Sequence, residues 1–412
     1  MRIPPTIPPP AVLKRSDDQF ITQTRRYRVI TPLFGGGVTP AEADPVMVIR
    51  GSEIRGHLRF WWRACHGGRF NGDLNAMKEV EDRLWGASST EAKPRPSRVQ
   101  VAAEVTNRGK QFVVRTGRGE QVRISAPKSP YGYAAFPLTD KPGAVVLEGI
   151  EFSVTITFPE AEQKEVEAAL WAWETFGGLG ARTRRGFGAL CCTHVDDDPT
   201  PLPQASNARA LIQQGLRKHV VSGRWPDGVP HLSQNTSFRV RPGTNALAAW
   251  QDMIGRLKKF RQTRNPGSQP NRPGRSQWPE PDAIRRLTGH RASLHASVLS
   301  NLDRFPRAAF GLPIIFHFKD KDRGDPPDTT LKGTESERLA SPLILRPIAC
   351  AGNQAVGLAL ILEAPRTPPG GLILKDAPSD PSVSASLTPA EARTITPLDG
   401  ETDVLLAFLS TL

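Results

Sequence analysis

Three arginines recur at four-residue intervals near the N-terminus, at Arg55, Arg59 and Arg63. On a helix that begins near Gly51, this spacing places the three guanidinium groups along one line. No acidic residue of that helix stands four positions from any of them. Neighbouring cations therefore repel one another by roughly a few tenths of a kcal/mol per pair, and a bound anion relieves the repulsion. The stripe predicts a phosphate-binding edge; a solvated face, or pairing with acids from elsewhere in the chain, is the alternative.

A second group of cations lies in a glycine-rich segment, GGLGARTRRGFG, between a predicted helix and a predicted strand. Glycine lets a backbone approach phosphate and expose its N–H groups, and arginine binds phosphate through two parallel hydrogen bonds. The segment is not a P-loop, because no Gly-Lys-Ser/Thr follows and it leads into a strand. An ordinary turn with solvated arginines is the alternative. The expected phosphate contacts are Gly177, Gly178, Gly180, Arg182, Arg184, Arg185, Gly186 and Gly188.

Acid–base catalysis would depend on His57, which flanks the apolar face of the first helix. An imidazole can activate a ribose 2′-hydroxyl in metal-independent RNA cleavage. A histidine beside a buried face is more often structural, so we expect no catalytic residue and keep His57 as the alternative. His290 and His295 lack the spacing of zinc ligands, and the run at Asp196–Asp198 is more typical of a solvated linker than of a magnesium site. No metal site and no cofactor is predicted.

The elements that hold these groups follow from hydrophobic periodicity. Ile54, Leu58, Trp61, Trp62 and Cys65 share a sector of about 100° on the first helix and predict a buried face. Strands are predicted at Arg25–Ile30, Arg98–Val105, Gly149–Phe158 and Gly188–Val195, and a second helix at Glu160–Phe176. The order is the split βαββαβ pattern of a ferredoxin-like, RRM-like domain, which we place at residues 1–200.

A second, more irregular α+β domain is predicted for residues 201–412, after an acidic, proline-rich linker. It contains a strand at Ser237–Arg241, a helix from Asn245 to about Arg261, and a low-complexity segment, Asn265–Pro281, that we expect to be a mobile loop. Between Arg239 and Arg286, eleven cations stand against three acids. That balance favours an RNA-tracking surface over a contact with another subunit.

The whole chain carries 54 Lys and Arg against 41 Asp and Glu, a formal net charge of +13 over 412 residues. This excess favours a polyanionic partner, nucleic acid before a membrane surface. No apolar run approaches the roughly 20 residues of a membrane span, so no membrane association is expected. The start, MRIPPTIPPPAVLKR, is not typical of a secretory signal, and the four cysteines form no C-x-x-C pair. We expect a cytoplasmic protein.

Two of these blocks, IRGSEIRGHLRFWWRA and TFGGLGARTRRGFGAL, resemble the two halves of the RAMP superfamily of CRISPR-associated proteins, whose hallmark is the glycine-rich loop. Further blocks, ITPLFGGGV, WPEPDAIRRL, RAAFGLPIIFHF and RLASPLILRP, resemble one branch of it. That branch is the first-numbered RAMP subunit of the type III-B (Cmr) effector complex. The resemblance extends from about residue 22 to about residue 362 and so covers both predicted domains.

The resemblance implies two ferredoxin-like domains packed together in a non-cleaving, RNA-binding subunit of an antiviral ribonucleoprotein. It implies guide RNA, towards its 3′ end, and captured target RNA as partners, together with other RAMP subunits. It implies RNA contacts from Arg50, Arg55, Arg59 and Arg63 and from the glycine-rich loop. No second loop of this kind is evident in the second half. A metal-independent endoribonuclease that matures guide RNA, with His57 as general base, is the alternative function.

Overall fold

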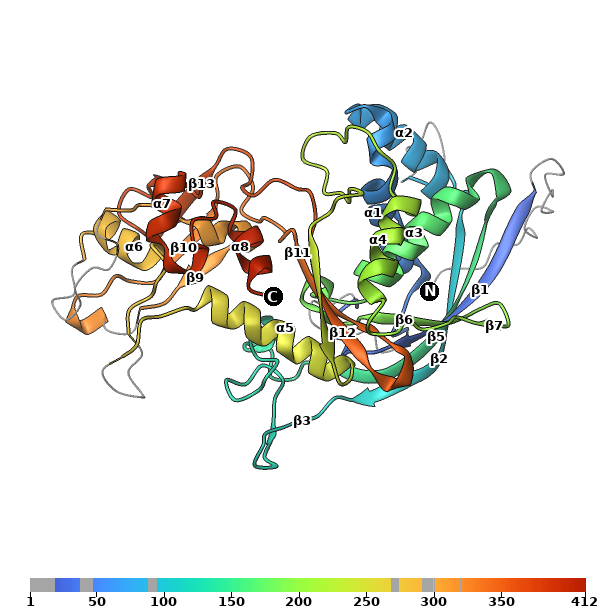
Figure 1. The fold of residues 1–412 in the computed structure, drawn as a ribbon, viewed down its shortest axis with the longest axis horizontal. Helices are drawn as coiled ribbons and strands as arrows, with labels where there is room; N and C mark the ends of the chain where they lie inside the picture. Colours follow the sequence, from blue (N-terminus) through green and yellow to red (C-terminus); the bar gives the residue numbers. More distant parts are fainter. Residues whose placement is uncertain are drawn as a thin grey trace, which may run out of the picture.

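The computed structural model describes residues 19–37, 47–87, 95–267, 274–290, 299, 301–318 and 321–412. The proline-rich start, Arg272 and His295 lie outside these residues, as does the centre of the segment expected to form a mobile loop. Two sheets of the two halves of the chain lie next to each other at the centre of the molecule, and a lobe of short strands and helices extends to one side (Figure 1).

The first half is built on a five-stranded antiparallel sheet in the order β2-β5-β1-β6-β7. The strands are β1 (Phe20–Val29), β2 (Gln100–Gln111), β5 (Leu147–Pro159), β6 (Leu190–Val195) and β7 (Asp198–Pro199). Helix α1 (Gly51–His66) connects β1 to β2, and α3 (Gln163–Phe176) connects β5 to β6. With β5 inserted between β1 and β2, this is the strand order that a split βαββαβ connection produces.

Four helices lie over one face of this sheet (Figure 1): α1, α2 (Leu74–Trp85), α3 and α4 (Ala208–His219). Alternate residues of β5, from Ile150 to Phe158, point into the interface and are buried, as the alternating sequence predicts. Trp62 of α1 and Trp173 of α3 are completely buried there. The predicted apolar face of the first helix is therefore confirmed.

A long insertion, residues 112–146, separates β2 from β5 and carries the short strands β3 (Val114–Arg115) and β4 (Gln121–Val122). It extends below the sheet, next to α5 (Figure 1). Its apolar residues, among them Tyr131 and Leu138, share a core with Trp250 and Phe187. The ring of Tyr131 stacks on that of Trp250 with 4.5 Å between centroids. The insertion is thus packed against both halves of the chain.

The second half contains a three-stranded sheet in the order β11-β12-β8, with α5 (Ala246–Arg261) packed on it. Its strands are β8 (Phe238–Gly243), β11 (Leu343–Ala349) and β12 (Ala355–Ile361). These elements follow the first four of a βαββαβ pattern. In the described residues after β12, the chain does not return a fourth strand to this sheet. The second half is α+β, as predicted, and departs from a complete ferredoxin-like unit.

The remaining elements form the lobe at the left of Figure 1. Its four-stranded sheet has the order β14-β13-β10-β9. The lobe comprises β9 (Ile314–Phe316), β10 (Thr329–Gly333), β13 (Leu372–Lys375), β14 (Ser382–Val383), α6 (Glu280–Thr288), α7 (Pro389–Thr394) and α8 (Val404–Ser410). Much of it is an excursion of the chain between α5 and β11. None of the helices in the described part of the chain is long and apolar enough to cross a membrane.

The two halves share their cores. Residues 238, 344 and 358 of the second half belong to the core of the first sheet, and helix α4, beyond residue 200, packs on α3. The side chain of Arg346 is completely buried and donates to the carbonyl oxygens of Gly177, at 2.7 Å, and Leu190, at 2.8 Å. The division into residues 1–200 and 201–412 stays a prediction.

Candidate nucleic-acid interface

Helix α1 begins at Gly51 and presents the arginines of the predicted stripe along one side of its buried face. Two of them are neutralised by α2. The guanidinium of Arg59 lies 2.8 Å from Glu81 and 3.2 Å from Asp82, and Arg63 pairs with the same Glu81 carboxylate. Both acids are almost completely buried. The expectation that Arg59 and Arg63 are unpaired is therefore wrong, because their partners come from a separate helix.

The other two cations of this region differ from that pair. Arg55 is exposed, and no ion pair or hydrogen bond of its side chain is found among the described residues. Arg50 precedes the first turn of α1, and its guanidinium donates to the carbonyl oxygen of Gly36. Of the four arginines predicted near the first helix, Arg55 is thus the one most available to a phosphate.

The glycine-rich loop does not present its backbone to an external ligand in the expected way. The N–H of Gly180 donates to the Glu53 carboxylate at 2.7 Å, and that of Gly188 to the carbonyl of Pro32 at 2.9 Å. Gly177 and Gly186 donate to carbonyls of Trp173 and Thr183. These four N–H groups are occupied within the protein, so they are not free donors for a phosphate, and the RNA contacts of these glycines stay a prediction. The N–H of Gly178 has no hydrogen-bond partner among the described residues, and its role stays a prediction.

The loop glycines have a packing role instead. Gly188 has φ +60°, and a Cβ at this residue would collide with the carbonyl oxygen of Leu179. Gly180 has φ +74°, and a Cβ there would lie 2.6 Å from the carbonyl oxygen of Phe34. Glycine adopts this conformation without strain and leaves room for the close backbone approach. The glycines therefore let three backbone segments meet, and this fixes where the loop arginines stand.

The three loop arginines occupy different environments. Arg185 is buried and donates to the carbonyls of Leu343, at 2.8 Å, and Phe310, at 3.0 Å, so it joins the two halves, and its RNA contact stays a prediction. Arg184 is half-buried, donates to the carbonyl of Ser341 at 2.6 Å and lies 5.5 Å from the ring of Phe60 on α1. Arg182 is half-buried, and its side chain makes no hydrogen bond with the described residues.

A fourth cation, Arg261 at the C-terminal end of α5, completes this group and was not among the predicted site residues. Its guanidinium donates to the hydroxyl of Tyr133 at 2.9 Å and lies 5.1 Å from the ring centroid of Phe310. Its sequence signal was weak, because it was one of eleven cations in a basic region. We call Arg182, Arg184, Arg185 and Arg261 the arginine cluster.

The electrostatics of the arginine cluster are those of a site for anions. Burial, and then the charges of Arg261 and Arg182, lower the pKa of Arg185 to about 9, which leaves it charged at neutral pH. Burial is also the main cause that lowers the pKa of Arg182 and Arg184. No carboxylate of the described residues forms an ion pair with any member. Close cations in a partly desolvated site repel one another, and an anion stabilises them.

His57 lies on α1 with its Nε2 atom 3.8 Å from the Glu53 carboxylate. Sequence reasoning missed this acid, although a spacing of four residues on a helix indicates it. The same carboxylate accepts the hydrogen bond from Gly180 N–H, which ties it to the loop. The pair holds the start of α1 against the glycine-rich loop. Among the described residues, no group of three or more His, Cys, Asp or Glu side chains has the arrangement of a metal site.

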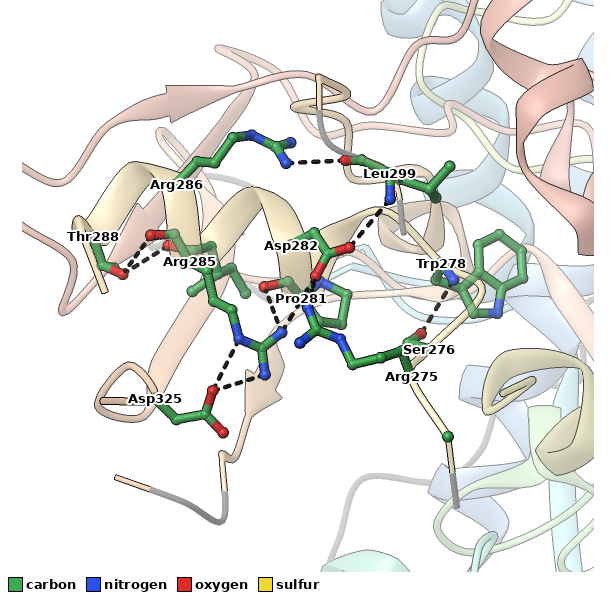
Figure 2. A network of polar contacts seen from close by, with 12 residues as sticks. Arg275, Ser276, Trp278, Pro281, Asp282, Arg285, Arg286, Thr288, Leu299 and Asp325 are labelled. Atoms are coloured by element: carbon green, nitrogen blue, oxygen red, sulfur yellow. Dashed lines mark hydrogen bonds and ion pairs between the residues drawn. The ribbon is translucent and has the colours of Figure 1, made fainter. Parts of the chain in front are cut away.

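Much of the charge in the second basic region is neutralised (Figure 2). Arg275 and Arg285 converge on Asp282, and Arg285 also lies 2.9 Å from Asp325. Asp282 and Asp325 are buried, and Arg286 pairs with Asp303. These contacts fold the start of the lobe around α6. The expectation that this whole region is an RNA-tracking surface is therefore wrong for these three arginines.

The open face of the first sheet is polar. In its middle, residues 22–28 of β1 and 151–157 of β5 alternate so that Thr, Ser, Arg and Glu side chains point away from the helices. The hydroxyls of Thr22 and Thr157 lie 2.9 Å apart across the strands. RRM domains stack two or three bases on aromatic side chains at the middle of this face. That mode of RNA recognition has no residues to support it here.

Comparison with known proteins gives a family. Residues 26–191 match the family model of the RAMP superfamily. The chain is 29% identical over 176 residues to the CRISPR system Cmr subunit Cmr1-2 of Pyrococcus furiosus, which is 39% of this chain and 89% of that protein. It is 27% identical over 146 residues to Cmr1-1 of the same organism, covering 34% of this chain and 40% of that protein.

Solved structures show the same fold. The apo crystal structure of Cmr1 from Pyrococcus furiosus matches with a TM-score of 0.50 at 18% identity, over 84% of this chain and 88% of that one. A chain of the cryo-EM structure of the type III-B Cmr-beta complex bound to cognate target RNA matches with a TM-score of 0.50 at 12% identity, over 95% and 100%. The resemblance to the RAMP superfamily and to Cmr1 is confirmed, and the fold is Cmr1-like.

Proposed function

Because residues 26–191 match the family model of the RAMP superfamily, we propose that this chain is a non-catalytic RNA-binding subunit of a type III-B CRISPR ribonucleoprotein. Its RNA partners are guide RNA, towards its 3′ end, and captured target RNA, and its protein partners are the other RAMP subunits. Support comes from the similarity to Cmr1 proteins and to a chain of a type III-B Cmr-beta complex that is bound to cognate target RNA. We place the complex in the cytoplasm, where it can bind RNA transcripts.

The observation that carries this function is the arginine cluster. Arg182 and Arg261 come from the two halves of the chain, and neither forms an ion pair with a carboxylate of the described residues. Arg184 links the cluster to α1 through Phe60, and the Glu53 carboxylate links the start of α1 to the same loop. An RNA backbone placed here meets the guanidinium groups of the arginine cluster together. Phosphate contacts of this kind hold RNA and leave sequence to base pairing.

We also propose that the second half descends from a second ferredoxin-like domain. The β8–α5–β11–β12 order and the placement of β12 between β8 and β11 repeat the first four elements of the N-terminal sheet. In this interpretation the chain after β12 forms part of the lobe and does not supply the second helix and fourth strand of the ferredoxin-like pattern. The cluster then lies between two related units, with Arg261 at the end of the helix that corresponds to α1.

The alternative, a maturation endoribonuclease, needs His57 as a base and a second group for the leaving 5′-oxygen. Glu53 is near enough to orient the imidazole but is held by the loop N–H of Gly180. Nothing in this arrangement places a proton donor opposite His57 among the described residues. Site-specific cleavage by the isolated protein that His57→Ala removes would favour this alternative.

The first experiment measures single-stranded RNA binding by the double variant Arg182→Ala/Arg261→Ala. We expect at least about tenfold weaker binding, because each substitution removes a guanidinium and its charge-assisted hydrogen bond to phosphate. The matched control is Arg256→Ala, which removes a cation of the same helix that is already paired with Asp252 at 2.9 Å. If the control and the double variant bind RNA equally well while both remain folded, the arginine cluster is not the RNA site.

A further inference from the structure

The insertion between β2 and β5 contains a pocket of about 310 Å³ that no part of the proposed function uses. Its apolar floor includes Phe112, Ile124, Leu138 and Val146. The lining contains two cations, Arg123 and Lys141, and no acidic residue. Its lining is polar and apolar in about equal parts. A pocket of this volume is at the small end of the range for ligand sites.

The floor of the pocket is fixed by the core of the molecule. Ile124, Leu138 and Val146 are buried and belong to the same apolar cluster as Trp250 of α5. The N–H of Phe112 donates to the carbonyl of Val146 at 2.8 Å, which closes the base of the insertion. A ligand therefore meets a base that is already formed, while the exposed side chains of the lining are ordered on binding.

The surface around the pocket is unusually apolar for an exposed segment. Val113, which lines the pocket, is 39% exposed, and Phe136 and Val145 of the same insertion are 56% and 46% exposed. They are three of the nine large apolar side chains that the described residues leave exposed. Exposed apolar groups on one insertion, one of them in the pocket lining, indicate a binding surface.

We propose that this pocket binds one unpaired nucleotide of RNA, with the base in the apolar space and its phosphate held by Arg123 and Lys141. This inference rests on the proposed RNA-binding function. The volume suits one ring system, and the ring of Phe112 offers an apolar surface for it. The amides of Gln111 and Gln121 and the hydroxyl of Ser125 supply donors and acceptors for the base edge.

Charge and position favour a nucleotide over a protein side chain. A lining whose charges all have one sign fits a group that carries an anion next to an apolar ring, as every nucleotide does. The insertion also contributes Tyr133 to the arginine cluster, through its hydrogen bond with Arg261. One insertion therefore contributes residues to both sites.

The test begins with the four nucleoside monophosphates and the intact chain. Saturation-transfer NMR at millimolar ligand should show transfer to base protons, and Ala144→Trp, which fills the pocket, should weaken this binding by at least about tenfold. The double variant Arg123→Ala/Lys141→Ala should weaken the binding of the monophosphates and leave the binding of the uncharged nucleosides unchanged. Arg118→Ala is the matched control, because this exposed arginine of the same insertion does not line the pocket.

A second arm uses RNA that carries 4-thiouridine, with the cross-linked peptide mapped. We expect a cross-link within residues 111–146 that Ala144→Trp removes and Arg118→Ala retains. If RNA binds through the arginine cluster but no nucleotide binds the pocket, the inference fails and the proposed function stands. If nucleotides bind the pocket but the chain does not retain RNA, the proposed function fails instead.

A protein ligand gives a third, separate result. If Ala144→Trp leaves nucleotide and RNA binding unchanged and releases a neighbouring subunit from the assembled complex, the pocket is a protein-docking site and the inference is overturned. Thermal melts of each variant separate these results from unfolding. Should Ala144→Trp melt early, the double variant of Arg123 and Lys141 decides, since both residues are exposed and their removal leaves the core intact.

Discussion

At the scale of single residues, the fate of each arginine depends on which carboxylate or carbonyl reaches it. Arg59 and Arg63 are neutralised by the buried Glu81, whereas Arg55, one turn away, is exposed and has no ion pair with the described residues. The guanidinium of Arg185 donates hydrogen bonds to carbonyl oxygens of the second half. The same residue type in one sequence block thus serves structure at some positions and is available for ligand at others.

Glu81→Gln tests the structural role of the stripe. Removing this buried carboxylate leaves Arg59 and Arg63 facing a neutral amide, so we expect a loss of roughly 1–3 kcal/mol in the free energy of unfolding. Urea unfolding followed by tryptophan fluorescence measures it. Glu79→Gln, an exposed acid of the same helix, is the control and should change stability by less than about 0.5 kcal/mol. Equal stability of the two variants would contradict the assignment of Glu81.

At the scale of elements, the glycine-rich loop is a packing device that positions cations. Its N–H groups at Gly180 and Gly188 are used within the protein, and its close approach to β1 and the following segment sets the direction of Arg182 and Arg184. In the proposed function, a phosphate at this loop is held by guanidinium groups from the loop and from α5, with the backbone as their support.

Gly188→Ala tests this role. The left-handed backbone and the collision with the Leu179 carbonyl should lower stability by roughly 1–3 kcal/mol and weaken RNA binding as the loop shifts. Gly56→Ala is the control with the opposite sign, because Gly56 is exposed in the middle of α1 with open space around it. Alanine there should raise stability by about 0.5–1 kcal/mol. Thermal melts and RNA titrations of both variants give the comparison.

At the scale of the whole molecule, the net charge of +13 overstates the number of cations available to RNA. Many arginines are used in ion pairs, as at Asp282, or in bonds to carbonyls, as at Arg346. The arginines of the candidate site that form no ion pair with the described residues, such as Arg182 and Arg261, lie where the two halves meet. The shared cores and the buried Arg346 hold the halves together, which keeps Arg182 and Arg261 in one place.

The salt dependence of RNA binding measures how many phosphates the molecule contacts. About three to four phosphates should be neutralised by Arg55 and the available members of the arginine cluster. For single-stranded RNA, log K against log salt should then fall with a slope of roughly −2 to −3. A slope near zero would mean that the excess charge serves another purpose. A slope much steeper than this would mean that further cations, outside the arginine cluster, also contact RNA.

The sequence by itself determined the local elements and the family. Periodicity placed the buried face of α1, the alternation of β5 and the βαββαβ order, because these depend on residues close together in the chain. The blocks around both arginine groups indicated the RAMP superfamily. Tertiary structure alone decided which arginines are free, since Glu81, Leu343 and Phe310 approach from elements distant in sequence. It also brought Arg261 and Tyr133 to the loop and formed the pocket of the insertion, because pairing and concavity depend on how elements pack against one another.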